Sequence, residues 1–454
     1  MDEGRLSADA SEVVLMASVA ATPDGIQHPA EPPEPRARQL RLPIEHSLLL
    51  TATLCLLAGG AVMVYSASAP SALSGGTAGG AGTLIRFVVY AAIGLAVLRY
   101  AARTELERIR YLTGRLLAVA FVLLLAVRIP GIGTTTLGAQ RWIGVGPVQF
   151  EPSELMKLAL VLYAAHVLSY GRLGGRNLHQ ALKRVGIVGT AAILLVASQP
   201  DIGTAMVIAM ALSAVVLAAG IPVRTLAVIA VVGIGAVVAY AIAVPYAGAR
   251  LTSFLDPWAH AFGTGRQSVQ SQVAVGSGGL FGRGPGASVQ KLYYLPEAPT
   301  DFILAVIGEE LGFVGIAVLL SLYGLIAYAG MRAARAARGT YALLIAVGVT
   351  SLIVFQATLN VFAVLGIAPI TGVPLPFVSY GASNLLVLLA GMGLLLNVAG
   401  GGAAHLRAVG STRRRKAKRS GGEQSAEDRD SSRRNRGTRR SGAGGRGRAA
   451  GAGG

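Results

Sequence analysis

Residues 301–330 read DFILAVIGEELGFVGIAVLLSLYGLIAYAG, a mostly apolar stretch that is long enough to cross a lipid bilayer. An α-helix rises about 1.5 Å per residue, so the apolar core of a bilayer requires a run of roughly 20 residues. On both sides of this stretch, between residues 47 and 400, apolar runs alternate with loops that are charged or rich in Gly and Pro. The pattern predicts an all-α integral membrane protein.

Ten apolar runs within residues 47–400 predict a membrane domain of ten transmembrane helices. They lie near residues 47–66, 83–99, 116–129, 153–170, 184–199, 202–220, 224–244, 301–330, 340–365 and 382–399. The count depends on residues 199–201, Gln-Pro-Asp, because one kinked helix through them would leave nine spans. Nine spans would place the basic loop 331–339 and the basic tail outside the cell, so we predict ten.

The composition excludes an ordinary soluble protein. Of the 454 residues, 53% are hydrophobic and 14% are charged, whereas a soluble domain has about 25% charged residues. The net charge is +18, and the segment after residue 400 carries +11 of it, from 15 Lys and Arg against four acids. The single cysteine, Cys55, lies in an apolar run, so a disulfide framework and a Cys-rich metal site are excluded.

The distribution of basic residues predicts the orientation, because Lys and Arg accumulate in cytoplasmic loops. Arginines cluster before the first predicted span and after the second, fourth and eighth, whereas loops 67–82 and 366–381 carry no charge. Both termini are therefore expected in the cytoplasm, with residues 1–46 as a disordered arm and residues 401–454 as a disordered basic tail. The long loop 245–299 is expected outside, and its Pro, Gly and aromatic motifs favour a functional role.

Ionisable residues at or inside predicted spans are the first candidates for a site, since a charge at the bilayer centre costs roughly 2.5–3.5 kcal/mol. Glu154 and Lys157 lie three residues apart, so they share a helix face and can pair; a structural ion pair between helices is the alternative. Asp201 follows a proline that interrupts an apolar run, which favours a broken helix lining a cavity over a simple turn. Arg141 and Trp142 lie at an outer interface, where anchoring explains Trp142 but not Arg141.

Asp301 stands at the start of the eighth predicted span. It follows Thr300, a good N-cap residue, so its role is either to compensate the helix dipole or to take part in function. Glu309 and Glu310 follow on the same span, and we expect them to pair with other helices.

Three further patterns carry little weight. Residues 288–291 fit S-x-x-K, but no other element of a penicillin-binding acyl-serine site follows. GRGPG at 282–286 has no Walker lysine, so a nucleotide site is not supported. The basic runs of the tail adjoin the last span, which favours contact with anionic lipids and not with nucleic acid.

Six motifs occur in order along the chain. They are GAQRWI at 138–143, FEPSELMK at 150–157, QPDIGTA at 199–205, SGGLFGRG at 277–284, QKLYYLPEAPTDFILAVIGEELG at 290–312 and TGVPLPFVSYGASN at 371–384. Together they resemble the SEDS family of FtsW, RodA and SpoVE over about residues 45–400. QKLYYLPEA is most similar to the division-type branch of FtsW and SpoVE. At Ala382 and Asn384 the chain departs from the family pattern.

The resemblance implies a ten-helix membrane glycosyltransferase that polymerises lipid II, an undecaprenyl-pyrophosphate-linked disaccharide peptide. Implied partners are a class B penicillin-binding transpeptidase and other division proteins. The family's catalytic aspartate matches Asp301. Its substrate-binding cavity residues match Arg141, Trp142, Glu154, Lys157 and Asp201.

In the implied reaction, the acceptor's sugar 4-hydroxyl loses a proton as its oxygen attacks the anomeric carbon of the donor, and Asp301 would be the general base. The pyrophosphate leaving group needs cationic help from Lys157, Arg141 or a divalent cation such as Mg²⁺ or Mn²⁺. No nucleotide is needed, since the donor is already activated. The expected location is the bacterial plasma membrane, at the division septum. A lipid II flippase or a non-catalytic division scaffold is the alternative.

Overall fold

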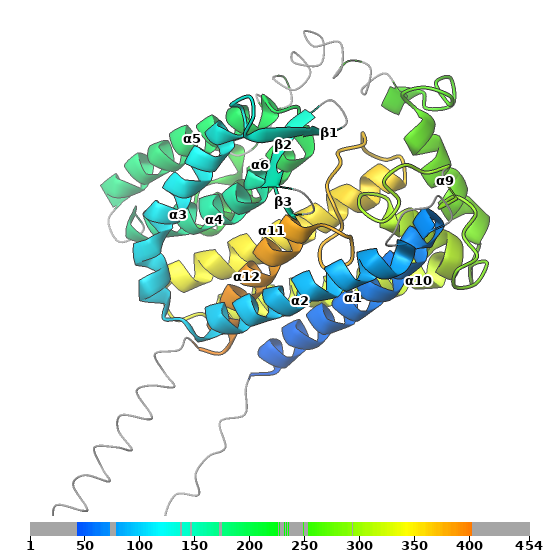
Figure 1. Cartoon of the computed structure of the whole chain (residues 1–454). Coiled ribbons are helices and arrows are strands. Elements are labelled where there is room, and N and C mark those ends of the chain that lie inside the picture. Colours follow the sequence, from blue (N-terminus) through cyan, green and yellow to red (C-terminus); the bar gives the residue numbers. More distant parts are fainter. Residues whose placement is uncertain are drawn as a thin grey trace, which may run out of the picture. The chain divides into compact units, whose positions relative to one another are not determined.

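The computed structural model describes residues 43–72, 79–136, 139–145, 148–171, 175–225, 253–292 and 294–401, with single residues at 227, 231, 233, 235 and 248. Most of this chain is helical (Figure 1). The helices are α1 Ile44–Ser68, α2 Gly79–Arg103, α3 Leu106–Ala126, α4 Pro152–Gly171, α5 Gly175–Ala197, α6 Ile202–Ala218, α9 Arg266–Gly278, α10 Ile303–Ala336, α11 Thr340–Val364 and α12 Ala382–Ala399, with a 3₁₀ helix at Ala69–Ala72. Nearly all of the predicted arm and tail, and most of the predicted span 224–244, lie outside the described residues.

Seven of the described helices are long and apolar enough to cross a membrane, namely α1, α2, α3, α5, α10, α11 and α12. Helix α6 is apolar but has only 17 residues, and α4 has 20. Both coincide with predicted spans. The prediction of a helical multi-pass membrane protein is therefore confirmed.

The chain breaks between α5 and α6, at the point on which the predicted number of spans depends. Helix α5 ends at Ala197 and α6 begins at Ile202, so these are two helices and not one kinked helix. Asp201 is the N-cap of α6, and its Oδ1 accepts a hydrogen bond from the backbone N–H of Thr204 at 3.2 Å. A side-chain acceptor at this position satisfies one of the free N–H groups of the first turn.

A small antiparallel sheet lies between α3 and α4 and was not predicted. Its strands are β1 Gly133–Thr136, β2 Ala139–Val145 and β3 Val148–Phe150, in the order β1-β2-β3. Ile143 on the central strand pairs with Gly133 on one side and with Phe150 on the other. The strands are short, so the sequence alternation is too brief to distinguish them from loop.

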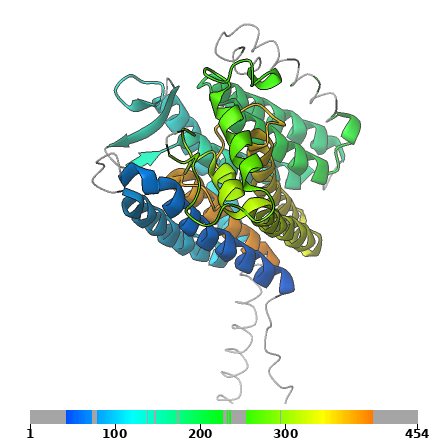
Figure 2. The ribbon, with the colours of Figure 1, turned by 90° about the vertical axis from the view of Figure 1, so that its right-hand side faces the viewer.

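Helices α11 and α12 form the interior of the bundle. Figures 1 and 2 show them (yellow and orange) between α1 and α2 on one side and α4 to α6 on the other. All residues of α11 from 344 to 350 are buried, so this helix is covered on every face. A helix that is apolar around its whole circumference belongs inside a bundle.

The segment between α11 and α12 also enters the interior, although it forms no helix. Val373, Leu375, Phe377 and Val378 on this segment are each at most 1% exposed. The Tyr323 hydroxyl of α10 donates to the carbonyl oxygen of Pro376 at 2.6 Å. Irregular backbone at membrane depth is tolerated where protein surrounds it in this way.

Candidate functional site

Lys157 on α4 is a buried cation, only 1% exposed. Its Nζ atom is 2.8 Å from Glu154 Oε1, the partner that the three-residue spacing predicted, and 2.9 Å from Gln356 Oε1 on α11. The ion pair offsets part of the cost of burying either charge. Sequence analysis did not single out Gln356; an amide side chain within an apolar span is the signal that could have identified it.

Gln356 and Asn360 lie one turn apart on α11 and hold the buried segment that follows this helix. Gln356 Nε2 donates to the carbonyl oxygen of Pro374 at 2.9 Å. Asn360 Nδ2 donates to the carbonyl oxygens of Val373 and of Asp301, both at 2.8 Å. The backbone of Asp301 is therefore fixed to the same helix that contacts the buried lysine.

Residues 371–374 lie where Asp301 and the start of α6 come together. Gly372 has a φ of +68°, and a Cβ atom there would lie 3.5 Å from Asp301 Oδ2. A Cβ atom on Gly203, in the first turn of α6, would lie 2.5 Å from the carbonyl oxygen of Thr371. Only glycine adopts the first conformation without strain and permits the second approach. The segment thus contacts both Asp301 and the helix that Asp201 caps.

Arg141 and Asp201, predicted separately, form an ion pair. Arg141 lies on β2, and its Nη1 atom is 3.8 Å from Asp201 Oδ1. The same guanidinium donates to the carbonyl oxygens of Gln199, at 2.9 Å, and Pro200. These carbonyl groups follow the end of α5, where no backbone N–H of a further helical turn can donate to them. Arg141 therefore holds the break between α5 and α6; Trp142 follows it on β2 and is partly exposed.

Glu151 is a further acid of this region that sequence analysis did not assign to the site. It lies just ahead of α4, outside the membrane-spanning segments, and its Oε1 accepts from the Ser153 hydroxyl at 2.8 Å. Burial, and then the carboxylates of Asp201 and Glu154, raise the pKa of the Glu151 carboxyl to about 8. Its backbone N–H donates to Ser383 Oγ of α12 at 2.9 Å.

Four of the eight buried polar side-chain atoms without a hydrogen-bond partner among the described residues belong to this region. Among the described residues, such atoms include Glu154 Oε2, Asp201 Oδ2, Asn360 Oδ1 and Thr371 Oγ1. Each belongs to the network of α4, α6, α11 and the segment 371–374. Buried polar groups normally have a hydrogen-bond partner. The unpaired acceptors and the Thr371 hydroxyl therefore indicate that water or a polar ligand binds at the site.

The prediction that Thr300 caps the eighth span was wrong. Helix α10 begins at Ile303, and its N-cap residue, Phe302, makes no side-chain capping bond. The Thr300 hydroxyl instead donates to Glu297, to the backbone carbonyl at 3.1 Å and to Oε2 at 2.8 Å. Asp301 lies in a turn ahead of α10 and is half-buried, in contrast to Lys157.

Helix α10 is interrupted at Gly312, where φ is +68° and ψ is −163°. The SGGLFGRG segment supplies the hydrogen bonds that the break removes. Arg283 and Gly284 donate their backbone N–H groups to the carbonyl oxygens of Glu309 and Glu310, at 2.9 and 3.0 Å. Phe313 and Val314 beyond the break donate to the carbonyl oxygens of Gly279 and Leu280, at 2.9 and 3.1 Å. Backbone groups at a helix break need such partners.

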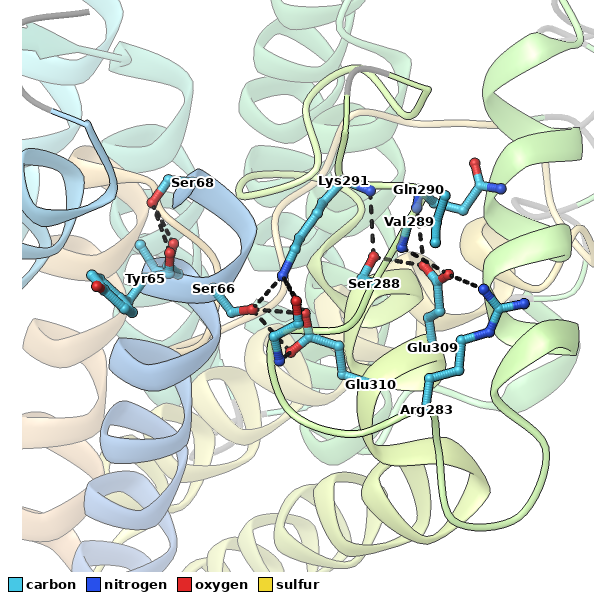
Figure 3. A network of polar contacts seen from close by, with 12 residues as sticks. Tyr65, Ser66, Ser68, Arg283, Ser288, Val289, Gln290, Lys291, Glu309 and Glu310 are labelled. Carbon is cyan, nitrogen blue, oxygen red and sulfur yellow. Dashed lines mark hydrogen bonds and ion pairs between the residues drawn. The ribbon is translucent and has the colours of Figure 1, made fainter. Parts of the chain in front are cut away.

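Glu309 fixes the chain that follows this segment (Figure 3). Its carboxylate accepts from the Ser288 hydroxyl at 2.6 Å and from the backbone N–H groups of Val289 and Gln290 at 3.0 and 3.2 Å. Arg283 Nη1 lies 3.4 Å from Glu309 Oε1. Glu309 was expected to pair with another helix, but its carboxylate is bound by the loop ahead of Asp301.

Glu310 joins the same loop to α1 (Figure 3). Its Oε1 lies 2.8 Å from Lys291 Nζ and accepts from the Ser66 hydroxyl of α1 at 2.7 Å. Its Oε2 accepts from the backbone N–H of Gly286 at 2.9 Å. Lys291 is thus paired with Glu310, and Ser288 with Glu309, so the S-x-x-K match at 288–291 is not an acyl-serine site.

The described residues do not fit a divalent cation held by protein side chains alone. His, Cys, Asp and Glu do not gather in groups of three or more anywhere in the described chain. Asp201 is engaged by Arg141, and Glu154 by Lys157. Oxygen ligands for Mg²⁺ or Mn²⁺ would have to converge on one point, and these two carboxylates face cations instead.

The bundle and its buried polar network define a polytopic membrane protein with a charged interior. The family described as "Cell cycle protein", which unites FtsW, RodA and SpoVE, matches residues 46–401. The chain belongs to this family.

Curated relatives and solved structures agree with this assignment. Stage V sporulation protein E of Bacillus subtilis is 38% identical over 352 residues, or 77% of this chain and 96% of the relative. The probable peptidoglycan glycosyltransferase FtsW of Coxiella burnetii is 39% identical over 77% of this chain and 95% of the relative. RodA of Thermus thermophilus is 30% identical, with a TM-score of 0.56 over 77% of this chain and 95% of that chain. A chain of a peptidoglycan synthase complex is 30% identical, with a TM-score of 0.63 over 77% of this chain and 96% of that chain.

Proposed function

We propose that this protein is a peptidoglycan glycosyltransferase that polymerises lipid II into glycan strands during cell division and releases undecaprenyl pyrophosphate. Family membership and the names of the FtsW relatives support the activity. The structural observation that carries it is the network of Lys157, Asn360 and the segment 371–374, which reaches Asp301 and leaves buried polar atoms unpaired. Such a network suits a polar substrate and not a lipid-filled interior.

Asp301 is the general base of the proposed reaction. The acceptor's sugar 4-hydroxyl transfers its proton to the carboxylate while its oxygen forms a bond to the anomeric carbon of the donor. The bond between that carbon and the pyrophosphate oxygen breaks, and the lipid pyrophosphate leaves. Asp301 is half-buried and its backbone is held by Asn360, so it combines access with a fixed position.

Lys157 supplies positive charge for the leaving group. Within the described chain, Glu154 and Gln356 take two of its three N–H groups, which leaves one for a phosphate oxygen. Arg141 has a different task, because its guanidinium is already engaged by Asp201 and by the carbonyls that follow α5. It positions Asp201 beside the site, and Trp142 anchors the sheet at the outer interface.

In the proposed topology, residues 47–400 cross the plasma membrane ten times with both termini in the cytoplasm and loop 245–299 outside. The basic loops and the separate helices α5 and α6 support this arrangement. A reporter fused after Gly400 should behave as cytoplasmic and one in loop 253–265 as external. The opposite result at either position contradicts the topology.

A class B penicillin-binding transpeptidase is the proposed partner, at the division septum with other division proteins. The similar chain in a peptidoglycan synthase complex supports such an assembly. An assembly of this protein with the transpeptidase would couple the polymerisation of glycan strands to their cross-linking.

The direct test is to incubate the purified protein and its transpeptidase with labelled lipid II and to separate the products on a gel. The parent should make glycan polymer. Asp301→Asn, which keeps the size of the side chain but removes the base, should reduce the rate by roughly 10²–10⁴-fold. Asp256→Asn, in the same loop region and exposed, is the matched control. Polymer from Asp301→Asn within a fewfold of the parent would assign this residue to structure.

A further inference from the structure

A pocket of about 380 Å³ lies at the turn between α2 and α3, remote in sequence from the site described above. Its lining includes Arg99 and Arg103 near the end of α2, and Arg108 near the start of α3. Glu105 is the acidic residue of the lining, so the pocket has a net charge of +2. Such a charge at the end of two spans is complementary to an anionic headgroup.

The guanidinium groups of the three arginines are exposed and can bind an anion. Within the described chain, no hydrogen bond or ion pair engages the guanidinium group of Arg99, Arg103 or Arg108. Other arginines at span ends differ in this respect: Arg110 contacts Ser169 and stacks on Tyr170, and Arg332 pairs with Glu45. An anion can therefore contact these three guanidinium groups without breaking a hydrogen bond or ion pair within the described residues.

The end of α2 that carries the pocket is fixed in place. Asn397 of α12 donates through Nδ2 to the carbonyl oxygens of Ala101 and Thr104, at 3.0 and 2.5 Å. Helix α12 also approaches α2 closely, since a Cβ atom on Gly393 would lie 2.4 Å from the carbonyl oxygen of Leu98. The pocket wall is thus built on the interior helix and does not depend on a loose loop.

Two exposed apolar stripes run from the pocket along the helices. On α2, Val89, Ile93 and Val97 follow the helical spacing that leads to the lining residues Ala96 and Tyr100. On α3, the positions after Arg108 continue in the same way. The large apolar residues exposed on this helix are Tyr111, Leu112, Val119, Val122 and Leu125. Lipid acyl chains can pack along such apolar stripes, whereas a free phosphate ion makes no favourable contact with them.

We propose that the α2–α3 turn binds an anionic phospholipid, with its phosphate between Arg99, Arg103 and Arg108 and its acyl chains along the two stripes. The proposal rests on the membrane character of the chain and not on the proposed activity. Arginine suits this role because its planar group can bind phosphate oxygens through two N–H groups at once.

Native mass spectrometry of the purified full chain can test the site with phosphatidylglycerol and phosphatidylcholine as probes. We expect the parent to bind phosphatidylglycerol at least about 10-fold more tightly than phosphatidylcholine. The triple variant Arg99→Gln/Arg103→Gln/Arg108→Gln should lose most of this preference, and Arg103→Gln alone should lose about 3- to 5-fold. Gel filtration of each variant shows whether it is folded.

The control is Arg332→Gln/Arg335→Gln/Arg338→Gln, which removes the same formal charge from exposed arginines at another span end, where Arg332 pairs with Glu45. It should retain the preference within about twofold of the parent. An equal loss in both triple variants would indicate diffuse attraction and overturn the site. Displacement of the lipid by inorganic phosphate at equal concentration would show a free-anion site and overturn the lipid assignment.

Discussion

The side-chain amide of Asn360 donates to the backbone carbonyl of Asp301, with 2.8 Å between Nδ2 and the oxygen. The same nitrogen donates to Val373 at 2.8 Å, so one buried amide aligns the proposed base with the segment between α11 and α12. This bond is made by the backbone carbonyl of Asp301 and not by its side chain. Asn360 therefore acts as a positioning residue, and its loss should affect the rate more than the fold.

We predict that Asn360→Leu lowers the polymerisation rate by about 10- to 100-fold, because a small displacement of a reacting group has effects of this size. Lipid II polymerisation by the purified variant measures the rate. Thr358→Val is the control, since its hydroxyl bonds only to Val354 in the same helix. Equal rates for Asn360→Leu and the parent would show that Asp301 is positioned without it.

The charge of Lys157 should be needed for chemistry, whereas folding should not need it once Glu154 is also neutral. The double variant Glu154→Gln/Lys157→Met removes both charges and leaves no unpaired ion, so it should remain folded. It should nevertheless make no polymer, because the cation for the leaving group is absent. Lys157→Met alone should also be inactive and less stable, since Glu154 then loses its partner. Polymer from a stable double variant would remove Lys157 from the site.

Glu309 should hold the loop that leads to Asp301. Glu309→Ala removes the acceptor for Ser288, Val289 and Gln290, so the loop should open more often. Limited trypsin digestion should then cleave after Arg283 at least about 10-fold faster than in the parent. Asp256→Ala, whose carboxylate bonds only locally, should digest like the parent. An unchanged digestion pattern in Glu309→Ala would mean that the backbone bonds to α10 hold the loop by themselves.

Glu151 should make stability depend on pH. Its pKa is raised from 4.5 to about 8, so between these values the folded protein holds a proton that the unfolded chain has lost. Stability from this group is therefore present below pH 4.5 and is lost as the pH rises towards 8. Thermal unfolding in detergent should show a smaller decline over this range for Glu151→Gln than for the parent. Glu107→Gln, an exposed acid, should follow the parent, and parallel curves for all three proteins would contradict the prediction.

The sequence was most informative where the relevant pattern is local. Apolar runs of bilayer length predicted the helices, and the spacing of Glu154 and Lys157 predicted their ion pair. Contacts between distant segments could not be predicted in this way. The pair between Arg141 and Asp201 depends on a sheet of short strands, and Gln356 is recognisable only once α4 lies beside α11.

The error at Thr300 has a related cause. Thr300 is a suitable capping residue at a predicted helix start, but its hydroxyl donates to the nearby Glu297 instead. Local hydrogen bonds of this kind compete with capping. Glu309 likewise found partners in a loop, because the break at Gly312 brings that loop to the helix.

The interruption of α10 also bears on how the chain is inserted into the membrane during its synthesis. Residues 279–284 precede α10, so they leave the ribosome before the helix whose broken backbone they complete. An unpaired peptide group in hydrocarbon costs several kcal/mol. If the partner segment came later in the chain, the peptide groups beside the break would lack partners until that segment had been synthesised. With the partner already made, α10 can pair as soon as it leaves the translocon. Because of the order of the two segments along the chain, the hydrogen-bond partners of the interrupted backbone at Gly312 are already present when α10 is inserted into the membrane.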